Sequence, residues 1–465
     1  GYIKREDRKN ILLLTDDIRV HSGVAQIGRE MVLNTCHKFN WVQLAGAITH
    51  PEKGKRLDLS KDTADKAGVE DASVMLYPTD GYGNPDLLRQ VVKSENIDAI
   101  FLITDPRYFT WLFQMENEIR KDTPIAYLNI WDDYPAPAYN REYYESCDAL
   151  FGISKQTVNI NKIVLGDKAN DKVIKYVPHG LDTSIFKPIE DEVKEFTKFK
   201  KYIREDKDFV LLFNSRNIRR KQIPDTLLAW KLFLDKLSEE ERNEVRFVLH
   251  TQPIDENGTD LTAIVDYLFG EDNDSVVFSN NKLSTEQMSY LYNSADGTIL
   301  LTSNEGWGLA LTESLLTGTP IIANTTGGMQ DQMRFVDNEG NWFTPTPEIP
   351  SNHRGTFKKH GKWALPVFPT NISIQGSVPT PYIFDDSCSA EDAAEQISSK
   401  ERKEIGLEGH KWATSDEAGF TAEKMGENII EGMEELFSTW QPREKFEFLS
   451  DDDFQPRKLE HSLKY

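Results

Sequence analysis

The stretch "TSNEGWGLALTESLLTGTPIIANTTGG", from Thr302 to Gly328, places two glutamates beside a cluster of glycines. The apolar run "GTILLTS" that leads into it predicts a strand, "GLALTESLLTG" predicts a helix, and "TPIIAN" predicts the next strand. Glu305 precedes the predicted helix and Glu313 lies within its second turn. This order predicts a parallel βαβ unit with the glutamates near the carboxyl end of a strand, where open α/β sheets bind their ligands.

Strands alternate with helices along most of the chain, which at 465 residues is too long for one compact core. The runs "NILLLTDD", "WVQLAGAIT", "DAIFLIT" and "PIAYLNI" predict a first sheet, and "DFVLLFNSR", "VRFVLHT" and "SVVFSN" predict a second one. We therefore expect an α/β fold of two Rossmann-like, doubly wound parallel-sheet domains that face a central cleft. The expected divisions are residues 1–188, residues 189–425 with an insertion at 344–381, and residues 426–465, a helix that returns toward the N-terminal domain and a polar tail.

Two segments depart from this alternation. The charged run "IEDEVKEFTKFKKYIREDKD", residues 189–208, is interpreted as the hinge between the halves. Residues 344–381 are rich in Pro, Gly, Asn, Thr and Ser and predict a long irregular loop, for which a binding loop and a surface insertion both stay open.

Composition excludes several classes of protein. A net charge of -22 argues against a surface that coats nucleic acid, although a local basic site is compatible with it. Three cysteines far apart in sequence indicate a reducing compartment, with neither a disulfide framework nor a zinc site. No apolar run approaches the ~20 residues of a membrane helix, and the first residues lack the apolar core of a signal peptide. We expect a cytoplasmic protein without an integral membrane segment, and composition leaves its oligomeric state open.

A pair of cations follows one predicted strand of the second sheet. In "NSRNIRRKQ", Arg216 lies just past the strand and Lys221 lies five residues on, before a helix. Cations at a strand end beside a helix N-terminus suit a diphosphate, and two solvated side chains in a loop are the alternative. Gly23 in "HSGVAQ" occupies the first strand-to-helix turn, where a bare backbone suits a phosphate. Neither a GxGxxG nor a GxxxxGK[ST] motif occurs.

The stretch that contains Glu305 has the elements of a sugar site. Gly306 and Gly308 let backbone N–H groups approach a ligand, and the helix N-terminus adds a positive dipole end. Two carboxylates, Glu305 and Glu313, suit the hydroxyls of two different polyols. Spacing alone leaves open the alternative of one capping glutamate and one solvated glutamate.

The chain resembles the retaining glycosyltransferases of family 4, which have the GT-B fold. The matching pieces occur in the family's order over most of residues 10–332, and they are "HSGVAQIGREM", "VPHGLDTSIFKP", "NSRNIRRKQIPDTLLAW", "SNEGWGLALTESLLTGTPIIAN" and "TTGG". The E-x7-E element, Glu305 to Glu313, together with the upstream Arg216 and Lys221, is the most specific of them.

The resemblance implies a role for each matching position. Glu305 would contact the transferred sugar, Glu313 would hold the ribose of the nucleotide, and Arg216 and Lys221 would neutralise the leaving diphosphate. Gly23 would lie near the phosphate from the other side of the cleft. The backbone around the helix start would meet the sugar and its phosphate, through Gly306, Trp307, Gly308 and Leu309. The resemblance implies an N-terminal acceptor domain, a C-terminal donor domain, a UDP-sugar co-substrate and no bound metal or cofactor.

The sequence also departs from the family. Members often carry a His after a central strand of the N-terminal domain, where this chain has Asp105, Asp132 and Asp133. One of these is expected to orient the acceptor hydroxyl, and a capping role is the rival. His179 stands where Asn is common and is interpreted as structural. The acidic run Asp451 to Asp453 lies in the predicted tail, away from any expected metal loop.

The acceptor is the least determined part. Some virus-encoded relatives glycosylate hydroxymethylated pyrimidines in DNA, and the N-terminal segments resemble such members, which makes phage DNA in a host cytoplasm the expected acceptor. A saccharide or glycan acceptor is the alternative. A non-catalytic nucleotide-sugar-binding module is a further alternative from another class, and an epimerase or phosphorylase on the same scaffold is less supported.

Overall fold

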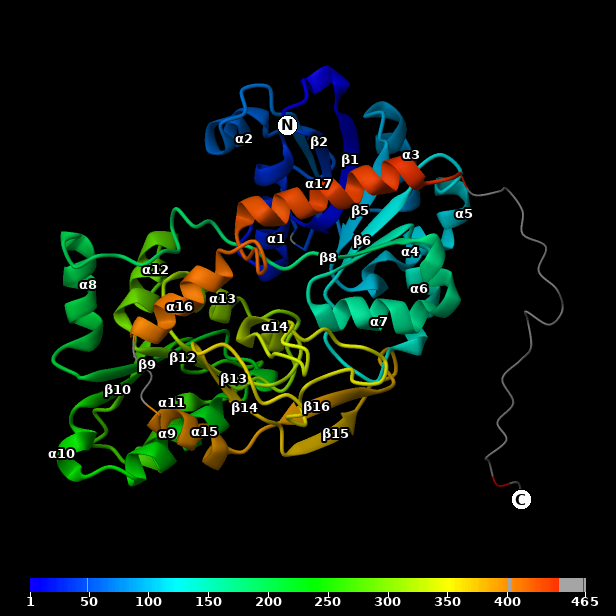
Figure 1. The fold of residues 1–465 in the computed structure, drawn as a ribbon. Helices are drawn as coiled ribbons and strands as arrows, with labels where there is room; N and C mark the ends of the chain where they lie inside the picture. The colour runs from blue at the N-terminus through cyan, green and yellow to red at the C-terminus, as the bar shows by residue number, and fades with distance from the viewer. Residues whose placement is uncertain (48, 400–402, 443–462, 464–465) are drawn as a thin grey trace.

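The structure is a computed structural model that describes residues 1–47, 49–399, 403–442 and 463. It contains two α/β domains, one above the other in Figure 1, each built on its own parallel sheet. Most of the predicted tail, including Asp451 to Asp453, lies outside the described residues.

The N-terminal domain is built on an eight-stranded sheet, which is parallel except for its edge strand β3. In sheet order its strands are β3 (Leu57–Asp58), β4 (Val74–Pro78), β2 (Phe39–Gly46), β1 (Lys9–Asp16), β5 (Ala99–Ile103), β6 (Ile125–Asn129), β7 (Ala149–Gly152) and β8 (Val173–Tyr176). Ile11 and Leu13 pack into one hydrophobic cluster and Leu12 and Leu14 into another. Both faces of the sheet are therefore buried, as a doubly wound fold requires.

Helices cover the two faces of this sheet. Those of the N-terminal segment are α1 (Gly23–Thr35), α2 (Ser60–Ala67), α3 (Pro85–Ser94), α4 (Thr110–Gln114), α5 (Glu116–Ile119), α6 (Arg141–Glu145) and α7 (Lys155–Leu165). A last helix, α17 (Ala422–Thr439), comes from the other end of the chain and lies beside α1, against β7 and β8.

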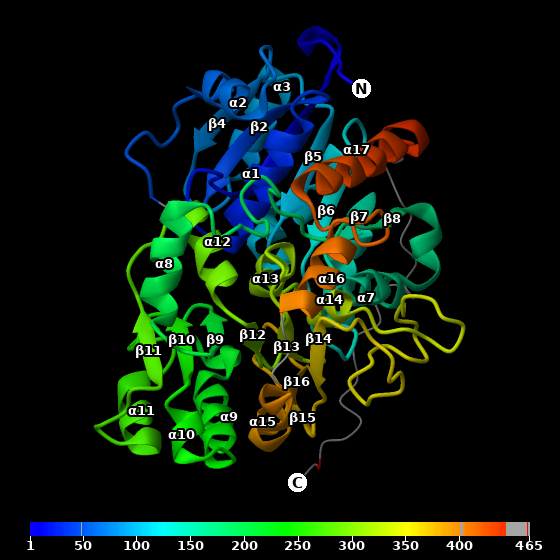
Figure 2. The ribbon, with the colours of Figure 1, turned by 60° about the vertical axis from the view of Figure 1, so that its left-hand side comes forward.

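The C-terminal domain has a six-stranded, fully parallel sheet. In sheet order its strands are β11 (Val276–Ser279), β10 (Val245–His250), β9 (Phe209–Asn214), β12 (Gly297–Leu300), β13 (Ile321–Asn324) and β14 (Ala364–Val367). Its helices are α8 (Lys194–Arg204), α9 (Ile223–Asp235), α10 (Glu239–Arg242), α11 (Leu261–Phe269), α12 (Thr285–Ser294), α13 (Leu309–Leu316), α14 (Met329–Met333), α15 (Ala390–Ser398) and α16 (Lys403–Ala413). Figure 2 shows this sheet from another side, with α9 and α15 next to each other.

One prediction for this half was wrong in detail, and one segment contains more regular structure than its composition indicates. The charged run at residues 189–208 is mostly helix α8, which packs on α12 through Phe196 and Phe199 against the ring of Tyr290. Residues 344–381 are not one irregular loop, because they contain β14 and β15 (Asn371–Gln375). β14 is an edge strand that carries Pro366, a position where a missing N–H is tolerated.

The contact between α17 and the N-terminal domain is close because α17 carries glycines there. A Cβ on Gly426 would lie 2.7 Å from the Asn34 Cβ and from its carbonyl oxygen, and a Cβ on Gly432 would lie 2.7 Å from the Phe151 ring. The helix therefore rests directly on α1 and on the sheet.

We predict that Gly426→Leu destabilises the protein by about 1–3 kcal/mol, because the added side chain forces α17 away from α1. Glu427→Leu, at the neighbouring exposed position on the same helix, is the matched control and changes stability little. Urea denaturation of both variants measures the difference, and equal midpoints would contradict the close packing described here.

Candidate active site

The predicted sugar loop connects β12 to α13 and meets two other backbone segments. A Cβ on Gly306 would lie 3.0 Å from the carbonyl oxygen of Ile130, at the carboxyl end of β6 in the other domain. Cβ atoms on Gly327 and Gly328 would overlap the carbonyl oxygens of Glu305 and Gly306. The Gly328 amide donates to the Glu305 carbonyl at 3.0 Å. The loop is thus held between the "TTGG" turn and the N-terminal domain.

Glu305 is buried in this loop and paired with cations from the turn that follows β9. Lys221 Nζ lies 2.6 Å from Glu305 Oε2, and the Arg220 guanidinium lies 3.6 Å from Oε1. Burial by itself would raise the pKa of Glu305, but the charges of Lys221 and Arg220 outweigh it and hold the pKa below its ordinary value. Glu305 is therefore a carboxylate at neutral pH.

Arg220 was not among the predicted site residues. It belongs to the short 3-10 turn η5 (Arg219–Lys221), and its guanidinium donates to the Asn304 carbonyl at 2.8 Å. Its own carbonyl accepts from the Ser303 amide at 3.0 Å, so the turn and the sugar loop are held together from both sides. The run "RRK" was the available signal, but the sequence does not show which of its cations the turn aims at Glu305.

Arg216, which was predicted, has a different environment. It is exposed just beyond β9, and within the described part of the chain its side chain has no hydrogen-bond or ion-pair partner. The structure thus brings Lys221 to Glu305 and leaves the Arg216 guanidinium free beside the same turn.

Glu313 is buried in the second turn of α13, and no cation of the described residues pairs with it. Within the same residues its Oε2 atom has no hydrogen-bond partner, and burial raises the pKa of its carboxyl to about 7. The Tyr292 hydroxyl is hydrogen-bonded to the Glu313 carboxyl, and it accepts from the Asn214 side chain at 2.8 Å. A buried carboxylate oxygen without a partner is costly, and a bound hydroxyl would satisfy it.

The start of α13 offers backbone donors. Gly308 has φ of 90° and precedes the helix, which begins at Leu309. The Gln332 side chain donates to the carbonyls of Trp307 and Gly308, at 2.9 and 3.0 Å. Among the described residues, the amides of Trp307, Gly308 and Leu309 donate to no protein acceptor. These N–H groups and the helix dipole favour an anion at this point.

Trp307 contributes to this arrangement through its backbone alone. Its indole Nε1 donates to Thr312 Oγ1 at 2.7 Å, and its ring packs edge-on against Phe420 with centroids 5.0 Å apart. The side chain is therefore part of the core beneath the loop.

The N-terminal domain presents Asp132 to Glu305, and Asp133 lies beside Asp132. Asp132 follows β6, and its charge interacts with those of Arg220 and Glu305. Burial raises the pKa of Asp132, and burial together with the neighbouring Asp132 charge raises the pKa of Asp133 well above its ordinary value. The two carboxyl groups therefore keep at least one proton between them to a higher pH than two isolated aspartates would.

The other two predicted residues of this domain are not brought against Glu305. Asp105 caps the short helix η2 (Pro106–Phe109) by accepting from the Arg107 amide at 2.9 Å, and it pairs with the Arg107 guanidinium at 3.1 Å. Gly23 begins α1, and a Cβ there would meet nothing within 4 Å, so this turn is open.

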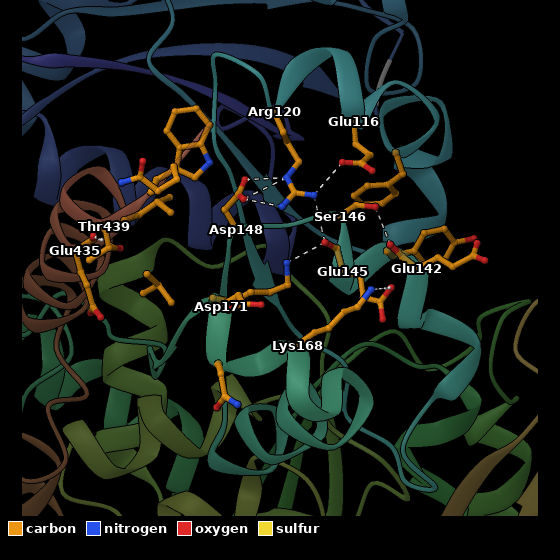
Figure 3. A pocket seen from close by; sticks show the side chains of 18 of the residues that line it. Glu116, Arg120, Glu142, Glu145, Ser146, Asp148, Lys168, Asp171, Glu435 and Thr439 are labelled. Carbon is orange, nitrogen blue, oxygen red and sulfur yellow. Dashed lines mark hydrogen bonds and ion pairs between the residues drawn. The ribbon is translucent and has the colours of Figure 1, made fainter. Parts of the chain in front are cut away.

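A large cavity, with a volume of about 1140 Å³, lies elsewhere in the N-terminal domain. Figure 3 shows it between α4, α6 and the end of α17, with Arg120 paired to Asp148 and Lys168 to Glu145. Asp148 directly precedes β7, whereas Asp132 follows the parallel strand β6. The cavity is therefore at the amino ends of these strands, whereas Glu305 is at their carboxyl ends. None of the predicted residues lines the cavity. No group of three or more His, Cys, Asp or Glu side chains suited to a metal ion occurs among the residues described.

Comparison with known proteins identifies a family in one part of the chain. Residues 194–349 match the model of the family described as glycosyl transferases group 1. No curated protein sequence matches the chain. None of the helices in the described ranges is long and apolar enough to cross a membrane.

Several solved structures share the fold over nearly the whole chain. HepE from Anabaena, in complex with UDP and glucose, aligns with a TM-score of 0.62 at 13% identity, covering 92% of this chain and all of HepE (100%). The sucrose-phosphate synthase of Thermosynechococcus elongatus aligns with a TM-score of 0.63 at 14% identity over 93% and 100% of the two chains. The α,α-trehalose-phosphate synthase (UDP-forming) of Burkholderia xenovorans, in complex with glucose-6-phosphate, aligns with a TM-score of 0.62 at 11% identity over 92% and 100%.

At such identities the likeness shows the fold, which is GT-B as predicted. Together with the family match, it shows that the chain carries a glycosyltransferase group 1 domain, a domain of transferase enzymes, on two Rossmann-like halves.

The raised pKa of Glu313 leads to a prediction about stability. The unfolded chain loses this proton near pH 4.5 and the folded protein near pH 7, so the folded state holds more protons between these values and is destabilised as pH rises through them. Relative to Glu313→Gln, the wild type should lose about 3 kcal/mol of unfolding free energy over that interval. Urea denaturation of both proteins from pH 4.5 to 7.5 measures this difference, and a difference independent of pH would contradict the burial of an unpartnered carboxyl.

Proposed function

We propose that the protein is a retaining glycosyltransferase that moves a sugar from a UDP-sugar to an acceptor hydroxyl. One observation carries the proposal: the Glu305–Lys221 pair and free amides lie at the N-terminus of α13, and the buried Glu313 carboxyl, with no partner for its Oε2 atom among the described residues, lies one turn further on. Binding of UDP and glucose by HepE, on the same fold, supports the donor class.

Each group of this helix end has its own role in donor binding. Glu305 accepts hydrogen bonds from sugar hydroxyls, and Glu313 accepts them from the ribose, which satisfies its Oε2 atom. The free amides of Gly308 and Leu309 and the free Arg216 guanidinium bind the diphosphate. Lys221 has three donors, so its ammonium can stay with Glu305 and also reach a phosphate oxygen.

The chemistry requires stabilisation of a leaving group. The bond between the anomeric carbon and the phosphate oxygen breaks, and its electron pair leaves with UDP. The acceptor oxygen bonds to the anomeric carbon on the same face, and its proton passes to the leaving phosphate. Lys221, Arg216 and the amides at the start of α13 would face the phosphate oxygens on which negative charge grows, and this would lower the barrier without a metal ion.

The acceptor lies on the side of the N-terminal domain. Asp132 follows β6 opposite Glu305, and it holds the acceptor hydroxyl in the orientation needed for attack. Trp131 and Tyr139, with the Arg107 guanidinium 5.3 and 5.6 Å from their rings, provide aromatic surface beside Asp132. Such surface suits a base, and the finer proposal is therefore a hydroxymethylated pyrimidine in DNA.

The donor is tested with variants of the helix end. Thermal shift with UDP-, GDP- and ADP-sugars is expected to single out a UDP-sugar. Lys221→Ala and Glu305→Ala are expected to lower the rate of sugar transfer about 10²–10³-fold, because each removes a charge placed for the transition state. Lys231→Ala is the control, since Lys231 is on the adjoining helix α9 and pairs with Asp235 alone among the described residues. Transfer at the wild-type rate in both active-site variants would refute the assignment.

The acceptor is tested by mass spectrometry after incubation with the identified UDP-sugar. Hydroxymethylated DNA is expected to gain one sugar per modified base, and a panel of free saccharides is the comparison. Unmodified DNA with glycosylated saccharides would replace the DNA proposal by the saccharide alternative, and donor binding without transfer to any acceptor would favour a binding module. Asp132→Asn is expected to lower kcat about 10²-fold while leaving the Kd for UDP unchanged.

A further inference from the structure

A β-hairpin contacts both domains and the sugar loop, residues 303–309. Its strands, β15 and β16 (Ile383–Ser387), pair antiparallel with each other and with neither main sheet. The hairpin leaves the C-terminal domain after β14 and returns to it at α15, and Figure 1 shows it beside β14.

On one side the hairpin binds the loops that follow β12 and β13. The Asp386 amide donates to the Ser303 carbonyl at 3.0 Å, and the Asn304 side chain donates to Asp385 Oδ1 at 2.6 Å. The Asn324 side chain donates to the Asp386 carbonyl at 2.7 Å. Asn304 directly precedes Glu305, so the hydrogen bond between Asp385 and Asn304 fixes the residue next to the proposed sugar-binding glutamate.

The same asparagine also connects to the cations. The Asn304 carbonyl accepts from Arg220, which in turn faces Glu305. Asp385, Asn304 and Arg220 thus form a continuous chain of contacts that ends at the Glu305 carboxylate.

On its other side the hairpin binds the N-terminal domain. The Phe384 amide donates to the Tyr134 carbonyl at 2.7 Å, and the Tyr139 hydroxyl donates to the Tyr382 carbonyl at 2.8 Å. Arg107 Nε donates to the Pro379 carbonyl at 3.0 Å. These partners lie on the loops that follow β5 and β6, and the second of these loops also carries Asp132.

We propose that the β15–β16 hairpin is a strap that orders the sugar loop only when it is docked on the N-terminal domain, with Asp385 as the positioning residue. This inference rests on the proposed function, because it concerns the placement of Glu305 for the donor sugar. Approach of the two domains and formation of the sugar site are then one event, because both depend on the same hairpin.

Hydrogen exchange of the ligand-free protein tests the strap without any reaction. The double variant Arg107→Ala, Tyr139→Phe removes the side-chain bonds from the N-terminal domain to the hairpin and touches no residue of the sugar loop. We expect exchange to rise about tenfold both in residues 371–387 and in residues 303–309. Val378→Ser, at the exposed tip of the same hairpin, is the control and leaves both segments unchanged. Faster exchange in the hairpin alone would refute the coupling.

The positioning role of Asp385 is tested with two substitutions. Asp385→Ala removes the acceptor of the Asn304 side chain and is expected to raise exchange in residues 303–309 and to raise KM for the donor about tenfold. Asp385→Asn keeps an acceptor oxygen and is expected to restore both quantities to near the wild-type values. Equal effects of the two substitutions, or none, would overturn the assignment of Asp385.

The two proposals can fail separately. If exchange in the hairpin and in the sugar loop is coupled but the protein transfers no sugar, the strap proposal stands and the transferase proposal fails. If sugar transfer depends on Glu305 but exchange in the two segments is not coupled, the transferase proposal stands and the strap proposal fails.

Discussion

The site depends on a close contact between three backbones, at which glycine is required. The loops that follow β6 and β12 and the turn at Gly327 and Gly328 meet so closely that a Cβ at Gly327 or Gly328 would overlap a carbonyl oxygen. Gly327 also has a φ of 54°, which favours glycine. Because backbone touches backbone here, Glu305 has little freedom of its own, and its position is set by the domains on either side.

The buried charged groups around this contact are typical of a binding site and unusual in a hydrophobic core. Glu305 is buried with Lys221 and Arg220 beside it, Asp132 faces it from the other domain, and Glu313 is buried without a cation. Buried carboxylates without partners lower stability, and proteins retain such groups chiefly where a ligand completes them. The arrangement is therefore better understood as a binding site, as the proposed function requires, than as a device for stability.

Much of the fold was predictable because its determinants are local. Short apolar runs identified the strands, and the same pattern placed Glu305 in the loop before α13 and Glu313 within that helix. Lys221 could be found from its spacing, but Arg220 could not, because the 3-10 turn η5 decides which cation points at Glu305. The cap formed by Asp105 depends in the same way on a short helix that no periodicity shows.

In two segments the composition of the sequence does not show how the residues pack. The charged run at residues 189–208 hides the apolar face of α8, since Phe196 and Phe199 are separated by Thr197 and Lys198. The Pro-rich stretch hides the edge strand β14, whose pairing partner β13 lies much earlier in the sequence. It also hides β15, whose partner β16 lies just beyond the stretch. Contacts of this kind are a property of the assembled domains.

The return of α17 to the first domain has a consequence for biosynthesis. The C-terminal sheet is complete once β14 has been made, whereas the N-terminal sheet waits for residues 422–439 to cover it beside α1. On the ribosome, the domain that is translated first is therefore the last to be finished, and its apolar surface stays open while its neighbour folds. The helix that completes the N-terminal domain follows the C-terminal domain in sequence. The chain therefore needs its C-terminal domain to fold early and reliably.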